Sequence, residues 1–263
     1  MKKEGIVAVS DEGRPVSNGS VMRRALLYAS HFDLPVISHC EELSLLDSGS
    51  MNDSETCTRL GLRPIVPAVE EAMVARDILI AEHEKKRVHI AHVSTRGSVE
   101  LIRQAKKRGV MVTCETAPHY LVMDDSDLKE EGRFKMNPPL RSKADREALI
   151  EGIKDGTIDM IATDHAPHSA EEKSRGLEKS PFGITGIETC FPVVYTKLVK
   201  TGIITLEKAI ELLAKSRYDE IVELIDRDEF TKDPMGAYRD KIYSKNAPMK
   251  TAVIWNKNYV EAE

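Results

Sequence analysis

Four side chains that could hold a metal ion stand at the ends of short apolar runs: Asp11, His39, His92 and Asp164. Neutral imidazoles and carboxylates are the ligands of a catalytic zinc that keeps one coordination position open. A single histidine at a strand end is more often a structural residue. Four metal-capable residues at equivalent places along the chain instead predict one shared metal site.

The stretch Ala162–His168 is the most specific of these segments. Pro167 takes the chain out of helix and into a loop. The carboxylate of Asp164, beside a metal-bound hydroxide, could act first as a general base and then as a general acid. His168 could reach a substrate group from the loop. The alternative for Asp164 is an aspartate that caps the next helix.

Two further loops could bind a substrate. A pair of prolines follows Asn137 and makes a rigid turn, so that the Asn137 amide could contact an imide or carboxylate edge. The turn around Phe182 and Gly183 could expose backbone N–H groups. Each is equally compatible with an ordinary loop. His119 could support the metal ligands, but we favour a structural role for it. The pair Glu41 and Glu42 could also support them, but we favour a position at a helix start.

The elements that position these residues alternate along the chain. Strand-like runs are Ile6–Asp11, Pro35–Cys40, Val88–Val93, Val110–Thr116 and Ile158–His165, and helical stretches are Ser20–Phe32, Val69–Glu84, Ser98–Arg108 and Lys143–Asp155. This alternation predicts βαβ units and a parallel sheet. Chemistry in an α/β barrel lies at the carboxyl ends of its strands. Side chains two apart share a strand face, so we expect His39 on the face of Ile37 and His92 on the face of Ile90.

Composition excludes several classes of protein. The chain has 263 residues with 38 Lys and Arg against 43 Asp and Glu, a net charge of -5, which argues against a nucleic-acid-binding surface. No apolar run approaches the ~18 residues of a membrane span, and the N-terminus has no signal-peptide pattern. The 4 cysteines form no C-x-x-C pair, so we expect a reducing, cytoplasmic location. Phosphate-binding glycine loops and a G-x-S-x-G nucleophile elbow are both missing.

Six motifs in order resemble one known family. They are Ser10–Val16, Ser38–Glu41, Ile90–Ser94, Asn137–Arg141, Ala162–His168 and Pro181–Gly183. Together they resemble class I dihydroorotase, a member of the amidohydrolase superfamily, over roughly residues 4 to 214. The resemblance implies a zinc-dependent (β/α)₈ TIM barrel. It also implies the interconversion of L-dihydroorotate and N-carbamoyl-L-aspartate in pyrimidine biosynthesis.

The same resemblance implies a role for each site residue. Asp11 matches the aspartate that bridges two zinc ions, His39 and His92 match the ligands of the second zinc, and Asp164 matches a ligand of the first zinc and the catalytic acid/base. Asn137, His168, Phe182 and Gly183 match positions that contact dihydroorotate. Hydantoinases and related cyclic amidases usually place a carboxylated lysine where Asp11 stands, which favours dihydroorotase.

The chain also departs from the family. Family members begin with a His-x-His-x-x-Arg strand, and no His-x-His occurs in this sequence. We therefore expect an incomplete α/β barrel, strands four to eight, over residues 1–214, and an unassigned, partly helical tail over residues 215–263. One zinc site would be held, while the second would lack ligands.

Alternatives to dihydroorotase activity stay open. The chain could be a catalytically incomplete subunit with a structural or partner-binding role, a truncated or split product, or a hydantoinase-like cyclic amidase. Unpaired sheet edges predict association with a second copy or with an N-terminal fragment. By the resemblance, aspartate transcarbamoylase is a further candidate partner. We expect a small-molecule substrate and neither nucleic-acid nor membrane binding.

Overall fold

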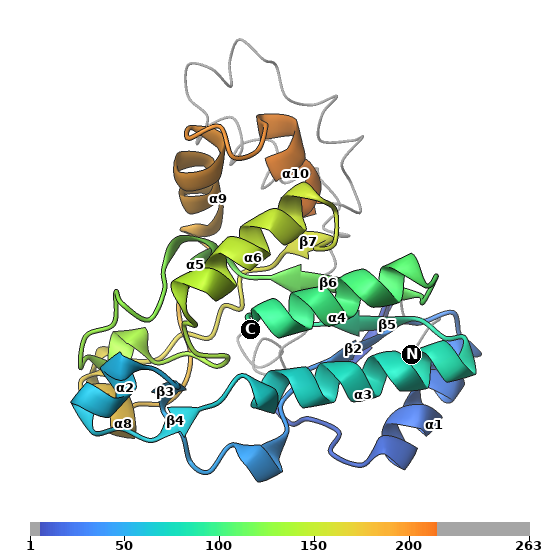
Figure 1. The fold of residues 1–263 in the computed structure, drawn as a ribbon, viewed down its shortest axis with the longest axis horizontal. Coiled ribbons are helices and arrows are strands. Elements are labelled where there is room, and N and C mark those ends of the chain that lie inside the picture. The colour runs from blue at the N-terminus through green and yellow to red at the C-terminus, as the bar shows by residue number, and fades with distance from the viewer. Residues whose placement is uncertain (1–5, 215–263) are drawn as a thin grey trace. The chain divides into compact units, whose positions relative to one another are not determined.

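A computed structural model describes residues 6–214 of the chain (Figure 1). The chain divides into two compact units between Glu188 and Thr189. The predicted boundary after residue 214 coincides with the end of the described residues, and the tail over residues 215–263 lies outside them. Both therefore stay predictions.

The first unit is built on a parallel sheet, as the alternation of runs predicts. In order across the sheet its strands are β1 (Val9–Ser10), β2 (Val36–Ser38), β5 (Val88–Ile90), β6 (Val112–Thr116) and β7 (Met160–Ile161). All neighbours pair in parallel. Each strand lies inside a predicted run but is shorter than it, because the chain leaves the sheet before the site residues. These residues therefore lie on the segments that follow the strands.

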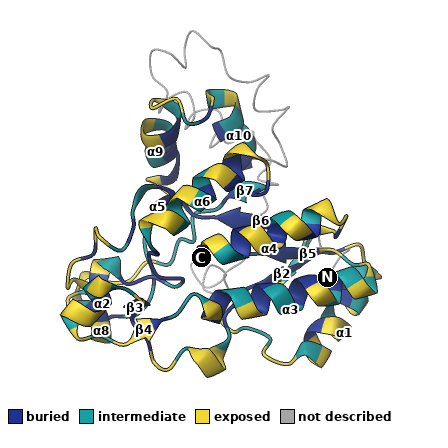
Figure 2. Ribbon diagram, in the orientation of Figure 1, coloured by how far each residue is buried: buried dark blue, intermediate teal, exposed yellow. Residues whose placement is uncertain are grey.

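Helices follow the strands at nearly the predicted places. They are α1 (Gly19–Ser30), α3 (Ala68–Glu84), α4 (Arg96–Lys107) and α6 (Lys143–Lys154). A polar side chain caps the start of α1, α4 and α6, and α6 has a full capping box between Ser142 and Asp145. Neighbouring helices pack in the order α1, α3, α4, α6. In the view of Figures 1 and 2, α3 and α4 cross in front of β2 and β5, and their buried stripes are dark blue.

Short elements fill the connections, and the sequence analysis did not predict them. Between β2 and α3 lie a 3₁₀ turn (Leu43–Leu45), β3 (Met51–Asn52), α2 (Glu55–Leu60) and β4 (Pro64–Ile65). After β6 come α5 (Pro118–Val122) and a 3₁₀ turn (Gly132–Phe134), and after β7 come α7 (Ala170–Lys173) and α8 (Gly176–Lys179). Periodicity is read over windows of about 11–18 residues, so elements this short give no periodic signal.

The second unit is described from Thr189 to Ala214. It contains α9 (Cys190–Val194), a π-helical continuation (Tyr195–Val199) and α10 (Leu206–Ala214). Phe191 is buried here, with Tyr195, Leu206 and Leu213 packed against it. Among the described residues of both units, no helix is long and apolar enough to cross a membrane.

Candidate active site

The side chains of His39 and His92 meet just beyond the ends of β2 and β5. Nδ1 of His39 lies 2.6 Å from Nε2 of His92, and the two rings stand edge to face with centroids 4.6 Å apart. Both residues are buried. The structure therefore brings together the two histidines that the sequence analysis singled out.

Strand alternation by itself does not explain this contact. In the β2–β5 register Ile37 pairs with His89 and Ser38 pairs with Ile90, so Ile37 and Ile90 lie on opposite faces of the sheet. The expectations that His39 follows the face of Ile37 and His92 the face of Ile90 therefore cannot both hold, because both strands end before their histidine and the two rings are in contact. His92 itself has a φ of 36°, a left-handed conformation that redirects the chain.

Asp164 has the same backbone feature, with a φ of 48°. Left-handed conformations at residues other than glycine cost about 1–3 kcal/mol and are concentrated at functional sites.

Burial raises the pKa of Asp164 to about 6, although the charge of His92 opposes that shift. A carboxyl group that titrates near neutrality suits proton transfer.

Glu12 completes a cluster that the sequence analysis missed. Its carboxylate oxygens lie 3.1 Å from Nδ1 of His39 and 3.5 Å from Nε2 of His92. One ligand atom from each of the three residues lies within 4.8 Å of the others, so the group could hold a metal ion. The available signal was the tandem pair of acids before Gly13, whose φ of 75° allows the chain to turn after β1.

The carboxylate of Asp11, the predicted bridging ligand, lies at the edge of this cluster. Its Oδ1 accepts a hydrogen bond from the His39 backbone N–H at 2.7 Å, and its Oδ2 accepts one from the Val16 N–H at 2.8 Å. Asp11 thus ties the segment after β1 to the end of β2. Its role as a metal ligand stays a prediction.

Charge coupling dominates the cluster. Burial alone would lower the pKa of His39, but hydrogen bonds to Glu12 and Glu41 outweigh it and raise the pKa to about 10. The pKa of His92 is also raised: burial would lower it, but the negative charge of Glu12 and a hydrogen bond to Glu12 outweigh burial. Burial would raise the pKa of Glu12, but the two histidines lower it instead. Protons on the imidazoles therefore balance the carboxylates, and a divalent cation at this point would replace those protons.

The donor set fits zinc. Two imidazoles and a carboxylate are three protein ligands of the kind that leave a fourth position open in catalytic zinc sites. Nδ1 of His92 is buried and has no hydrogen-bond partner among the described residues, so the other ring nitrogen, Nε2, carries the polar contacts of this side chain.

Asn137 reaches the cluster through Glu41. The Asn137 Nδ2 donates to Glu41 Oε1 at 2.7 Å, and Glu41 Oε2 lies 3.3 Å from Nε2 of His39. The expected helix-start role is therefore wrong for Glu41. It is confirmed for Glu42, whose side chain caps the 3₁₀ turn at Leu43 by accepting a hydrogen bond from the Ser44 N–H.

The other predicted substrate contacts gather in a second group. Nε2 of His168 lies 2.8 Å from the Phe182 carbonyl oxygen, and the Gly183 N–H donates to the Lys135 carbonyl at 3.0 Å. Gly183 has a φ of 141°, which side chains rarely allow. His119, by contrast, is buried in α5 with its ring against Tyr120.

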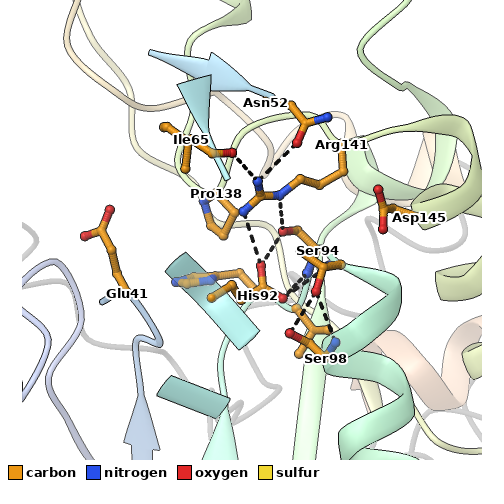
Figure 3. Close-up of polar contacts among 12 residues, drawn as sticks. Glu41, Asn52, Ile65, His92, Ser94, Ser98, Pro138, Arg141 and Asp145 are labelled. Atoms are coloured by element: carbon orange, nitrogen blue, oxygen red, sulfur yellow. Dashed lines mark hydrogen bonds and ion pairs between the residues drawn. The ribbon is translucent and has the colours of Figure 1, made fainter. Parts of the chain in front are cut away.

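Behind the site lies a buried network around Arg141 (Figure 3). The guanidinium donates to the Ile65 carbonyl at 2.8 Å, to Asn52 Oδ1 at 3.2 Å and to Ser94 Oγ at 3.1 Å. Ser94 and its neighbour also donate to the buried carboxylate of Glu70. The network thus joins β3, β4 and the segment after His92 to the loop that carries Asn137.

Comparisons with known proteins agree with this arrangement. Residues 1–98 match the family model described as Dihydro-orotase-like. The dihydroorotase of Acetivibrio thermocellus is 55% identical over 212 residues, which cover 80% of this chain and 50% of that protein. The dihydroorotase of Bacillus cereus (strain AH820) is 50% identical over 220 residues, 83% of this chain and 51% of that protein. The chain thus spans about half the length of the curated relatives it matches.

Solved structures with a similar fold are cyclic amidases. The D-hydantoinase from a Bacillus sp. AR9 has a TM-score of 0.70 at 24% identity, over 82% of this chain and 50% of that chain. The dihydropyrimidinase from Brevibacillus agri NCHU1002 has a TM-score of 0.67 at 23% identity, over 89% of this chain and 50% of that chain.

The parallel α/β sheet, with imidazoles and carboxylates beyond its carboxyl ends, has the TIM-barrel type of fold of these solved structures. At the level of sequence, the chain is similar to dihydroorotases over 80–83% of its own length and about half of theirs, and its residues 1–98 match the Dihydro-orotase-like family model.

Proposed function

We propose that the chain carries the metal-binding and proton-transfer residues of a dihydroorotase, which hydrolyses a cyclic amide to interconvert L-dihydroorotate and N-carbamoyl-L-aspartate. The observation that supports this most directly is the buried group of Glu12, His39 and His92 beyond the ends of parallel strands. It lies in a sequence that is 55% identical to a dihydroorotase. Asp164, with its raised pKa, completes the set.

His39, His92 and a carboxylate from Glu12 or Asp11 would hold zinc. When bound, zinc supplies polarisation of a carbonyl oxygen and activation of water. Asp164 would accept a proton during attack on the ring carbonyl and deliver it to the leaving nitrogen. A pKa of about 6 leaves Asp164 mainly ionised at neutral pH yet able to take up a proton.

Asn137, His168, Phe182 and Gly183 would orient the substrate in this proposal. The Asn137 Nδ2 already donates to Glu41, so its carbonyl oxygen is the atom available to accept from a ring N–H. His168 is held through its Nε2 against the Phe182 carbonyl. The similarity to hydantoinases is one of fold, and the aspartate at position 11 continues to favour dihydroorotate as substrate.

The test uses the purified chain with added zinc. Dihydroorotate consumption is followed by absorbance, and bound metal is counted by atomic absorption. We expect His39→Ala to lose zinc and activity together, and Asp164→Asn to lose activity while it keeps the zinc bound at His39 and His92. His83→Ala is the matched control, because that histidine side chain is 84% exposed. Wild-type zinc content in His39→Ala would contradict the site.

A second candidate function is a catalytically incomplete subunit that acts together with a second polypeptide. The candidates are an N-terminal fragment, a second copy of the chain and aspartate transcarbamoylase. β1 and β7 are the outer strands of the described five-stranded sheet, and outer strands can pair with another chain. Activity that depends on an added polypeptide with His-x-His-x-x-Arg would favour this function over the first.

A further inference from the structure

Lys173 is the last residue of α7, and its ammonium group donates hydrogen bonds to main-chain carbonyl oxygens. Its Nζ donates to the carbonyl oxygens of Gly132 at 3.1 Å, Lys135 at 2.9 Å and Pro181 at 2.8 Å. An ammonium group has three N–H donors, so three carbonyl partners account for all of them. Hydrogen bonds from a charged donor are also the stronger kind.

The three carbonyls belong to two loops with separate origins. Gly132 and Lys135 lie on the segment that leads into Asn137, whereas Pro181 directly precedes Phe182 and Gly183. α7 itself begins directly after His168, where Ser169 forms a capping box with Glu172. One side chain therefore connects the segments that carry all four proposed substrate contacts.

Further contacts hold the same two loops together. The Gly183 N–H donates to the Lys135 carbonyl at 3.0 Å. The ammonium of Lys135 donates to the Glu178 carbonyl at 2.7 Å and lies 4.6 Å from the centroid of the Phe182 ring. The packing is close, because a Cβ on Gly132 would lie 2.3 Å from the Lys173 carbonyl oxygen. The Lys173 side chain thus sits in a built contact between the loops and is not a mobile surface lysine.

We propose that Lys173 is a positioning residue: its ammonium group holds the Asn137 loop and the Phe182–Gly183 loop at a fixed separation, so that both can contact one ligand. This rests on the proposed function, since it takes those loops to bind dihydroorotate. Loops that are ordered before binding spare the ligand the cost of ordering them. Displacing a substrate-positioning group by about 1 Å can cost up to about 100-fold in rate.

The first experiment measures the loops directly. Lys173→Met keeps a long side chain and removes all three donors, and Lys179→Met is the control at an exposed lysine on α8. In the zinc-loaded full chain, we expect amide hydrogen exchange to accelerate at residues 132–137 and at Phe182 and Gly183 in Lys173→Met only. Exchange in β5 and α4 should stay as in wild type. Unchanged exchange in both loops would overturn the proposal.

The second experiment measures ligand affinity by calorimetry with L-dihydroorotate as the probe. Because the ligand would then have to order the loops, we expect Kd to rise about tenfold or more in Lys173→Met, with zinc stoichiometry equal to that of wild type. Lys173→Arg, which keeps charge and donors, should recover part of the affinity. Wild-type affinity in Lys173→Met, or a joint loss of zinc and ligand, would contradict a role confined to the loops. If the wild-type chain itself binds no dihydroorotate, the proposed function fails, while hydrogen exchange still decides whether Lys173 holds the loops.

Discussion

Replacing Arg141 with methionine would remove a buried cation that joins distant segments of the fold. The Arg141 side chain is 3% exposed and bonds to Asn52 on β3, to the main chain of Ile65 on β4 and to Ser94 after β5 (Figure 3). Methionine is also long and flexible, so the substitution mainly deletes the charge and its donors rather than opening a large cavity.

The structure sets the size of the effect. The Ile65 carbonyl and Asn52 Oδ1 would each lose a donor, and an unsatisfied buried acceptor costs about 1–3 kcal/mol. The Glu70 carboxylate, 3.9 Å from Arg141 Nη2, would lose a buried counter-charge. Removing one partner of a buried ion pair costs about 3–5 kcal/mol. Glu70 keeps its bonds from the N–H groups of Ser94 and Thr95. We therefore expect the free energy of unfolding to fall by about 4 kcal/mol, within that range.

Urea unfolding followed by circular dichroism measures this loss. With an m-value of about 2 kcal/mol/M, a loss of about 4 kcal/mol lowers the midpoint by about 2 M. Arg133→Met is the matched control, because that arginine is 65% exposed and paired with Glu131. A surface pair of this kind contributes at most about 1 kcal/mol. A midpoint shift below about 0.5 M in Arg141→Met would refute the reasoning.

A double substitution tests the charge argument separately. If the uncompensated carboxylate of Glu70 causes much of the loss, Glu70→Gln combined with Arg141→Met should be more stable than Arg141→Met alone. Coupling between contacting residues is about 0.5–3 kcal/mol. A double variant that is less stable than the single one would show that lost hydrogen bonds, not the unpaired charge, dominate.

Three further predictions concern pH, backbone strain and metal binding. Burial lowers the pKa of His119 from 6.5 to about 3, so between these pH values the unfolded state takes up a proton that the folded state does not. The stability of the fold is therefore highest above pH 6.5 and falls as the pH is lowered toward 3. Between pH 7 and pH 5, wild type should lose about 2 kcal/mol relative to His119→Phe in urea titrations, and parallel profiles would contradict this. Gly183→Ala places a Cβ 2.4 Å from the Ala166 carbonyl oxygen at a φ of +141°, and should lower the unfolding temperature more than Gly61→Ala, whose Cβ meets no atom within 4 Å. The pKa of His39 is raised to about 10 without metal, so zinc binding at pH 8 should release protons. The measured binding enthalpy should then depend on the ionisation enthalpy of the buffer. Equal binding enthalpies in two buffers of different ionisation enthalpy would refute this prediction.

The alternation of strands and helices could be predicted because its signals are local. Runs such as Val88–Val93 and amphipathic stretches such as Ser98–Arg108 carry their own periodicity, and each contains or closely matches an observed element. The ends of the strands could not be predicted. A strand ends where its partner stops pairing, and β7 keeps only Met160–Ile161 of a longer apolar run.

The candidate site, too, could be predicted from the sequence only in part. Residue type and position after an apolar run were enough to select His39, His92 and Asp164. The contact between the histidines depends on the left-handed backbone of His92, and no alternation pattern contains that information. Glu12 enters the cluster through a glycine turn and the pairing of β1 with β2, which are properties of the folded sheet.

By itself, the sequence determined the α/β class, the order of the longer elements, and two of the three residues in the candidate metal cluster, His39 and His92, because periodicity and side-chain chemistry are properties of short segments. Only the tertiary structure determined which residues contact one another. The Arg141 network joins residues from Asn52 to Arg141, and Lys173 joins loops at Gly132 and Pro181. Such contacts depend on strand register and on the paths of irregular loops. These become defined only when the whole unit packs, since each loop is held by residues that are distant in the chain.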